Sequence, residues 1–179
     1  MYPRETLEAF DALLRVRGIR LDGVVIGGAA LSLLGIISRE TKDFDILSPP
    51  LDAGVVDASK DLAAQVRRKG GVLSDDWLNN GPATLASDLP AGWEARLQLA
   101  FRGESIELHT LGRSDLLKAK VFALCDRGID LADCIALRPT ATELADLLPW
   151  LEVRDLHPGW PAHARETVAD LGRRLGHAL

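Results

Sequence analysis

Cysteine, positive charge and long apolar runs are all scarce in this chain of 179 residues. Its two cysteines, Cys125 and Cys134, are too few for a disulfide scaffold and lack the further Cys or His ligands of a structural zinc site. The longest apolar stretch, residues 24–37, is shorter than the ~20 residues that span a bilayer, and residues 1–10 lack the apolar core of a signal peptide. We therefore expect a reduced, cytoplasmic protein with no membrane role.

Aromatic residues and basic clusters are also sparse. The four tryptophans are spread along the chain without interleaved Lys or Arg, unlike a base-stacking platform. Because 26 acidic residues outnumber 21 basic ones, the net charge of -5 excludes a protein held to nucleic acid by its overall charge. The basic clusters at residues 67–69 and 173–174 are interpreted as solvated helix ends, and a local contact with an RNA backbone stays open.

The hydrophobic pattern predicts an α/β fold. Apolar residues at helical spacing predict helices at residues 4–17, 29–34 and 51–68, and helical spacing resumes from Ser114 with breaks near Gly128, Pro139 and Pro158. A short apolar, β-rich run predicts a strand at residues 23–26, and alternation predicts strands at residues 41–47, 94–101 and 105–111, the last two as a hairpin. We expect a small mixed sheet packed by helices in residues 1–113, with a helical C-terminal portion, residues 114–179, packed on this core.

Asp43 and Asp45 are the sharpest chemical feature of the sequence. Residues two apart on a strand project to one face, about 6.6 Å apart at ~3.3 Å per residue. Two such carboxylates repel each other unless a cation lies between them, and Mg²⁺ or Mn²⁺ with hard oxygen ligands meets that need. Phe44 and Ile46 would anchor the strand from behind. On its own, the same pattern also fits an exposed polar strand face.

A glycine pair, Gly27-Gly28, joins a predicted strand to a predicted helix. Glycine lets backbone N–H groups approach a triphosphate, and the following helix N-terminus supplies a positive dipole, although an isolated Gly-Gly is most often only a turn. With Arg39 and Thr41, the pair gives the pattern Gly-Gly-x10-Arg-x-Thr-x-Asp-x-Asp. In this pattern the sequence resembles the nucleotidyltransferase-like superfamily and is similar to AbiEii-type toxins of type IV toxin–antitoxin systems.

A second block supports the resemblance. Lys120, Arg127, Asp130 and Asp133 are similar to the K-x-x-A-x-x-x-R…D-x-x-D segment of those proteins. Seven residues on a helix bring Lys120 and Arg127 within about 20° of each other, so both can point into one cleft. A lysine on a helix this apolar needs a partner, for which phosphate is a candidate; Lys118 is its rival. Asp130 and Asp133 also fit a helix N-cap and first turn.

The resemblance implies a third carboxylate on a later strand. Glu107 is the natural candidate, because it shares a strand face with His109, opposite Ile106 and Leu108. Aspartate is more usual at that place, and an incomplete triad would leave nucleotide binding without efficient transfer. His109 is a candidate base or a structural strand histidine.

The resemblance thus implies a Mg²⁺-dependent transfer of a nucleoside monophosphate from a nucleoside triphosphate to tRNA or another RNA, a protein or a small molecule. The implied metal-binding and catalytic residues are Asp43, Asp45 and Glu107. The implied nucleotide-binding residues are Gly27, Gly28, Arg39, Thr41, Lys120 and Arg127, with Asp130 and Asp133 as further candidates.

Several alternatives stay open. Arg39 fits an ion pair with Asp43 or another carboxylate as well as a phosphate contact. A toxin would be controlled by an antitoxin partner. A non-catalytic nucleotide-binding module, or a regulatory partner within a toxin–antitoxin pair, is the alternative to an enzyme, and a structural protein without a ligand is the third class.

Overall fold

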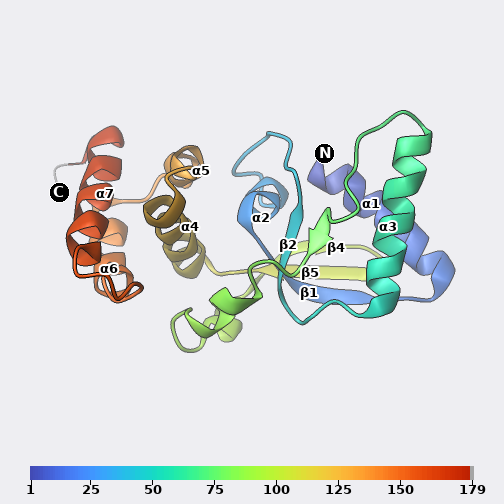
Figure 1. Cartoon of the computed structure of the whole chain (residues 1–179), viewed down its shortest axis with the longest axis horizontal. Helices are drawn as coiled ribbons and strands as arrows, with labels where there is room; N and C mark the ends of the chain where they lie inside the picture. Colours follow the sequence, from blue (N-terminus) through green and yellow to red (C-terminus); the bar gives the residue numbers. More distant parts are fainter. Residues whose placement is uncertain (178–179) are drawn as a thin grey trace. The chain divides into compact units, whose positions relative to one another are not determined.

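The chain folds into two units, seen in a computed structural model that describes residues 1–177 (Figure 1). Unit 1 comprises residues 1–87 and 96–111, and unit 2 comprises residues 88–95 and those from Gly112 onward. The predicted α/β class is confirmed, because a mixed sheet packs with helices and the C-terminal part is helical. Among the described residues, no helix combines the length and apolarity needed to cross a membrane.

Unit 1 is built on a five-stranded sheet of order β3-β2-β1-β5-β4. Its strands are β1 (Leu21–Ile26), β2 (Phe44–Ser48), β3 (Leu78–Asn79), β4 (Gln98–Arg102) and β5 (Ile106–Thr110). The central β1 pairs antiparallel with β2 and parallel with β5, while β4 and β5 form the predicted antiparallel hairpin. Val24, Val25 and Ile26 are buried, which suits a central strand covered on both faces.

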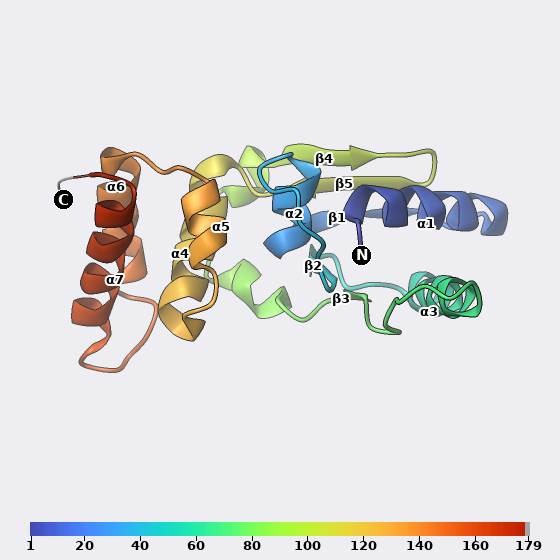
Figure 2. The ribbon, with the colours of Figure 1, turned by 90° about the horizontal axis from the view of Figure 1, so that it is seen from above.

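Three α-helices belong to unit 1: α1 (Pro3–Arg17), α2 (Gly27–Leu33) and α3 (Ala53–Arg68). Helices α1 and α3 pack against each other, and α2 contacts β1 and β2 (Figure 2). The α3 helix begins where the Asp52 side chain accepts a hydrogen bond from Val55 N at 2.9 Å, an N-cap that satisfies an otherwise orphaned backbone donor. The segment at residues 77–90 contains β3 and the short 3-10 helix η1 (Ala83–Ser87).

Trp77 lies within the core of unit 1. Its ring packs edge-on against Phe10 of α1 and Phe44 of β2, with centroid distances of 5.2 and 5.7 Å. Its indole Nε1 donates to the Ser59 carbonyl of α3 at 3.0 Å, so burial leaves no donor unpaired. One side chain thus ties β2, α1 and α3 together just before the short strand β3.

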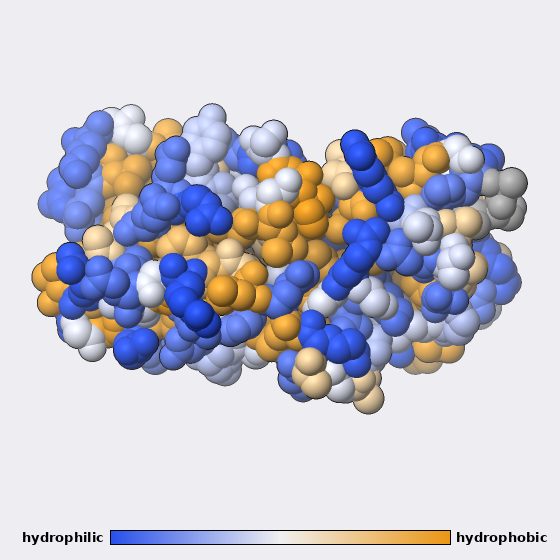
Figure 3. Space-filling view, turned by 180° about the vertical axis from the view of Figure 1, so that it is seen from behind, coloured by the Kyte–Doolittle hydropathy of each residue, from blue (hydrophilic) through white to orange (hydrophobic). Residues whose placement is uncertain are grey.

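Unit 2 consists mainly of α4 (Arg113–Arg127), α5 (Leu131–Ala136), α6 (Ala141–Leu151) and α7 (Trp160–Arg174). The predicted breaks near Gly128, Pro139 and Pro158 fall between these helices. Another short 3-10 helix, η2 (Trp93–Arg96), occupies the start of the predicted strand at residues 94–101. The face in Figure 3 shows apolar patches between hydrophilic ones, a mixture that is ordinary for folded domains.

Both cysteines are free and buried, as expected for structural thiols. Burial raises the pKa of Cys125, and burial together with nearby Asp130 raises the pKa of Cys134 to about 12. Because the thiolate is the reactive form, these two side chains act as small apolar groups rather than as nucleophiles.

Candidate functional site

The glycine pair lies directly against Asp45. Strand β1 ends at Ile26 and α2 begins at Gly27 with no loop between them, which requires a left-handed φ of 75° at Gly27. Ile26 is paired with Asp45 on the adjacent antiparallel strand. A Cβ atom at position 27 would lie 2.9 Å from Asp45 Oδ2, a distance too short for a real side chain. Glycine therefore lets the backbone approach this carboxylate.

The second glycine faces the segment that precedes β2. A Cβ atom at position 28 would lie 3.3 Å from Thr41 Cγ2 and 3.5 Å from Arg39 Nη2. The Arg39 side chain is exposed, and its Nη1 donates to the Glu40 carbonyl at 3.4 Å. The fold thus brings the two glycines close to the side chains of Arg39, Thr41 and Asp45.

Asp43 lies just outside the strand on which it was predicted. Strand β2 begins at Phe44, because Thr41 instead exchanges backbone hydrogen bonds with Met1, Thr41 N to Met1 O at 3.0 Å and Met1 N to Thr41 O at 2.9 Å. Phe44 and Ile46 are fully buried, as expected for the anchoring face. Asp43 is exposed. Because it lies outside β2, the separation of about 6.6 Å expected between Asp43 and Asp45 on one strand does not apply.

Glu107 is not brought to the aspartate pair. Glu107 pairs with Asp22 of β1, whereas Asp45 pairs with Ile26, four residues further along the same strand. At ~3.3 Å per residue and ~4.8 Å per strand, this offset places the Cα atoms of Glu107 and Asp45 about 16 Å apart. Glu107 Oε2 accepts a hydrogen bond from Arg102 Nε at 2.9 Å. This position does not support the prediction that Glu107 is the third carboxylate of the site.

Asn79 is a neighbour of Asp45 that the sequence analysis missed. It pairs with Asp45 across β2 and β3, so both side chains project to the same face of the sheet. Its Nδ2 donates to the Asp76 carbonyl at 3.4 Å and its Oδ1 accepts from Gly81 N at 2.7 Å. A two-residue strand inside an aperiodic segment leaves no sequence signal by which Asn79 could be found.

The carboxylates present fit one kind of metal site. Within residues 1–177, no three His, Cys, Asp or Glu side chains gather as a cluster that could hold a metal ion. Mg²⁺ needs fewer protein ligands, since one or two carboxylates bind it together with substrate phosphates and water. Asp43 and Asp45 provide two carboxylates, and the absence of a side chain at Gly27 lets Asp45 Oδ2 lie close to the backbone of the turn. These residues fit a nucleotide-bound Mg²⁺ rather than a metal cage made of protein ligands alone.

In unit 2, Lys120 is buried and held by two aspartates. Its Nζ donates to Asp130 Oδ1 at 2.9 Å and to Asp133 Oδ2 at 2.7 Å, and Arg127 Nη2 donates to Asp130 Oδ2 at 3.0 Å. Carboxylates thus supply the partner that burial of Lys120 requires, and the predicted contact of Lys120 with a phosphate stays a prediction. Asp130 occupies the N-cap position of α5 without a capping bond from its side chain, which is used in these ion pairs instead.

A mixed sheet whose glycine turn contacts an acidic strand is the arrangement expected of the nucleotidyltransferase class. Residues 5–139 match the family DUF6036, described as a nucleotidyltransferase of unknown function, and the chain belongs to this family. The resemblance to the nucleotidyltransferase-like superfamily is thereby confirmed, and the likeness to AbiEii-type toxins stays a prediction. No curated protein and no solved structure matches the chain.

Proposed function

We propose that this protein is a Mg²⁺-dependent nucleotidyltransferase that moves a nucleoside monophosphate from a nucleoside triphosphate to an acceptor. The observation that carries the proposal is the closeness of the Gly27 backbone to Asp45 and of the Gly28 backbone to Arg39 and Thr41, which an added Cβ atom would meet at 2.9 to 3.5 Å. Phosphate binding needs a close backbone and a cation, whereas metal binding needs carboxylates. The closeness of the glycine turn to Arg39 and Asp45 supports the proposal, and membership of a family described as nucleotidyltransferases supports the same activity.

Different residues of unit 1 bind the phosphates and the metal ion in the proposed reaction. The Gly27 and Gly28 backbone binds the phosphates, and the Arg39 guanidinium offsets their charge. Asp43 and Asp45 would hold Mg²⁺, which when bound stabilises the charge that develops on the phosphoryl oxygens. An acceptor oxygen attacks the α-phosphorus, and pyrophosphate leaves. The predicted nucleotide contacts of Lys120 and Arg127, with Asp130 and Asp133 as further candidates, lie in unit 2 and stay predictions.

The test is transfer of label from nucleoside triphosphates labelled at the α-phosphate, with Mg²⁺ or Mn²⁺ present. The acceptors are total RNA, a protein extract and a mixture of small hydroxyl compounds. Asp43→Asn and Asp45→Asn keep the side-chain shape and remove the charge, so transfer should fall by about a hundredfold or more. Asp22→Asn is the matched control, since Asp22 is an exposed carboxylate at the opposite end of β1. Equal activity in all three variants contradicts the proposal.

A second candidate is a nucleotide-binding module without transferase activity. The specific observation that favours it is the position of Glu107, about 16 Å from Asp45 by strand geometry, where it cannot complete a carboxylate triad. This candidate predicts Mg²⁺-dependent nucleotide binding that is lost in Asp45→Asn, with no label on any acceptor. Such a module would suit the regulatory partner of a toxin–antitoxin pair.

The toxin role implied by the likeness to AbiEii-type proteins is a finer proposal. Expression of an active toxin should arrest growth, and Asp45→Asn should restore it because the carboxylate is lost. If an adjacent reading frame encodes a small DNA-binding protein that is the antitoxin, co-expression of that protein should also restore growth. Normal growth with an active transferase would separate the enzyme activity from a toxin role.

A further inference from the structure

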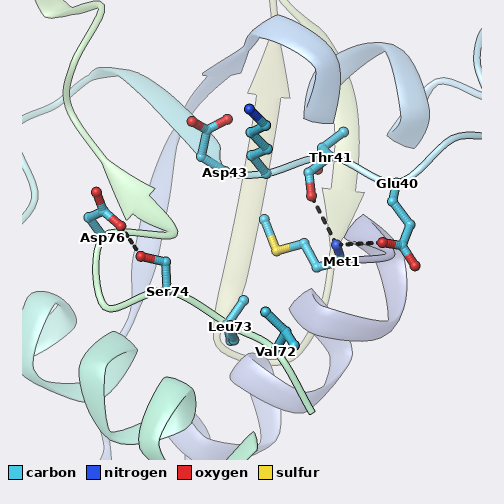
Figure 4. Close-up of a pocket in the computed structure, with 9 residues that line it drawn as sticks. Met1, Glu40, Thr41, Asp43, Val72, Leu73, Ser74 and Asp76 are labelled. Atoms are coloured by element: carbon cyan, nitrogen blue, oxygen red, sulfur yellow. Dashed lines mark hydrogen bonds and ion pairs between the residues drawn. The ribbon is translucent and has the colours of Figure 1, made fainter. Parts of the chain in front are cut away.

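A pocket of about 510 Å³ opens beside Asp43, within unit 1 (Figure 4). The segment before β2 contributes Glu40, Thr41, Lys42 and Asp43, and the segment between α3 and β3 contributes Val72, Leu73, Ser74 and Asp76, with Met1 between the two. Its volume is in the range of small-molecule sites. Thr41 contacts the Gly28 turn and also lines this pocket, so the pocket adjoins the proposed nucleotide site.

Thr41 lines the pocket with a side chain that is almost wholly buried. The residue is only 6% exposed, and its Oγ1 has no hydrogen-bond partner within the described structure.

The charges of the pocket indicate which ligands fit. Three carboxylates line it, those of Glu40, Asp43 and Asp76, against the Lys42 ammonium and the Met1 ammonium that pairs with Glu40 at 3.3 Å. This lining has no surplus of positive charge for a polyanion such as RNA. The residues that form it include no aromatic ring on which a base would stack.

We propose that this pocket binds the acceptor, and that the acceptor is a small, neutral or cationic molecule carrying hydroxyl groups. This inference rests on the proposed transferase function. An acceptor hydroxyl oxygen forms a bond to the α-phosphorus, and the bond from that phosphorus to the bridging oxygen of the β-phosphate breaks. Pyrophosphate leaves with the electron pair, and the hydroxyl proton passes to solvent water.

The first test measures binding without nucleotide, so its outcome does not depend on any transfer reaction. Glucosamine, glucose and glucose 6-phosphate share one ring and differ in charge, and their binding is followed by ligand-observed NMR. We expect glucosamine to bind at least as well as glucose, and glucose 6-phosphate to bind at least tenfold more weakly. Preference for the phosphorylated sugar, or no binding of any of the three, overturns the proposal.

The second test fills the pocket without disturbing the core. Val72 lines the pocket but is 92% exposed, so Val72→Trp should fold normally and reduce sugar binding at least tenfold. Val16→Trp on α1 is the control, because Val16 is 81% exposed and does not line the pocket. An equal loss of nucleotide binding in Val72→Trp means that the pocket holds the nucleotide, and the proposal is then wrong.

The third test uses the labelled nucleotide with all three acceptor classes. If label is transferred to small molecules and Val72→Trp reduces that transfer, the result supports the proposal. Label in RNA or protein that Val72→Trp leaves unchanged overturns it, while the proposed transferase function stands. Absence of transfer to every acceptor, with sugar binding intact, instead contradicts the transferase function.

Discussion

Gly27 combines two constraints that can be separated by mutation. Its φ of 75° disfavours any side chain, and a Cβ atom would also lie 2.9 Å from Asp45 Oδ2. Gly35 has a similar φ of 72° with nothing within 4 Å of a Cβ atom. We expect both Gly27→Ala and Gly35→Ala to lose about 1–2 kcal/mol of stability from backbone strain. Only Gly27→Ala should also weaken nucleotide binding, by about tenfold or more, because it displaces Asp45.

Urea unfolding and nucleotide titration of the two variants measure these effects. If Gly35→Ala weakens nucleotide binding as much as Gly27→Ala does, backbone strain explains the loss and the contact with Asp45 has no special role.

Lys120 is the residue on which the buried charges of unit 2 depend. Lys120→Met keeps the length of the side chain but removes the ammonium that pairs with buried Asp130 and Asp133, while Arg127 still pairs with Asp130. Breaking a buried pair in this way typically costs about 3–5 kcal/mol. Lys118→Met on the same helix removes a half-buried lysine outside this cluster and should cost less than about 1 kcal/mol. Similar urea midpoints for the two variants would refute the structural role assigned to Lys120.

At the scale of elements, the start of α6 depends on one glutamate. Thr140 and Glu143 form a capping box, and Arg113 Nε donates to Glu143 Oε1 at 2.6 Å, which links α4 to α6. The hydrogen bond from Arg113 lowers the pKa of Glu143 from 4.5 to about 2. Because the folded-state pKa is the lower one, this stabilisation is present above pH 4.5 and is lost as the pH falls toward 2.

Glu143→Gln should therefore remove part of the acid sensitivity of the protein. Glu143 is 29% exposed, so solvent screening reduces the expected loss to about 1 kcal/mol at neutral pH. The difference in the free energy of unfolding between Glu143→Gln and the wild type should shrink as the pH falls from about 5 to 3. Chemical unfolding across this range measures it, with Asp146→Asn, exposed on the same helix, as the control. If the difference in the free energy of unfolding stays constant with pH, the pKa of Glu143 is not lowered by Arg113 as stated.

The elements themselves were largely predictable. Helix α1 spans Pro3–Arg17 where its apolar spacing and Gly18 predict it, and β5 alternates as its sequence indicates. The start of β2 was placed too early, because its polar residues also suit a strand and the backbone of Thr41 pairs with Met1 instead. The short strand β3 carries no periodic signal. Local sequence patterns thus predict those helices and strands that are long enough for the hydrophobic pattern to repeat.

At the scale of the whole molecule, nucleotide binding should stabilise some parts of the chain and not others. A ligand at 100 times its Kd adds about 2.7 kcal/mol to the stability of the state that binds it. Hydrogen exchange with and without Mg²⁺ and a nucleoside triphosphate should show the largest protection at Gly27, Gly28 and β2. Loss of this protection in Asp45→Asn, and its persistence in Asp22→Asn, would show that the carboxylate is required.

The same measurement tests the predicted nucleotide contacts of Lys120 and Arg127. Protection of α4 that depends on nucleotide, and that Arg127→Gln removes, supports the prediction for Arg127. Unchanged exchange along α4 contradicts it and leaves Lys120, Asp130 and Asp133 as a structural cluster.

The sequence by itself determined the fold class, the family and the glycine and aspartate motif, because these depend on local periodicity and on spacing within about 20 residues. Only the tertiary structure decided which of the predicted residues meet. Strand register separates Glu107 from Asp45, Asp130 and Asp133 pair with Lys120, and the segments that precede β2 and β3 form the pocket beside Asp43. Register and pocket shape arise from contacts between residues far apart in the chain, and those contacts leave no periodic trace in the sequence.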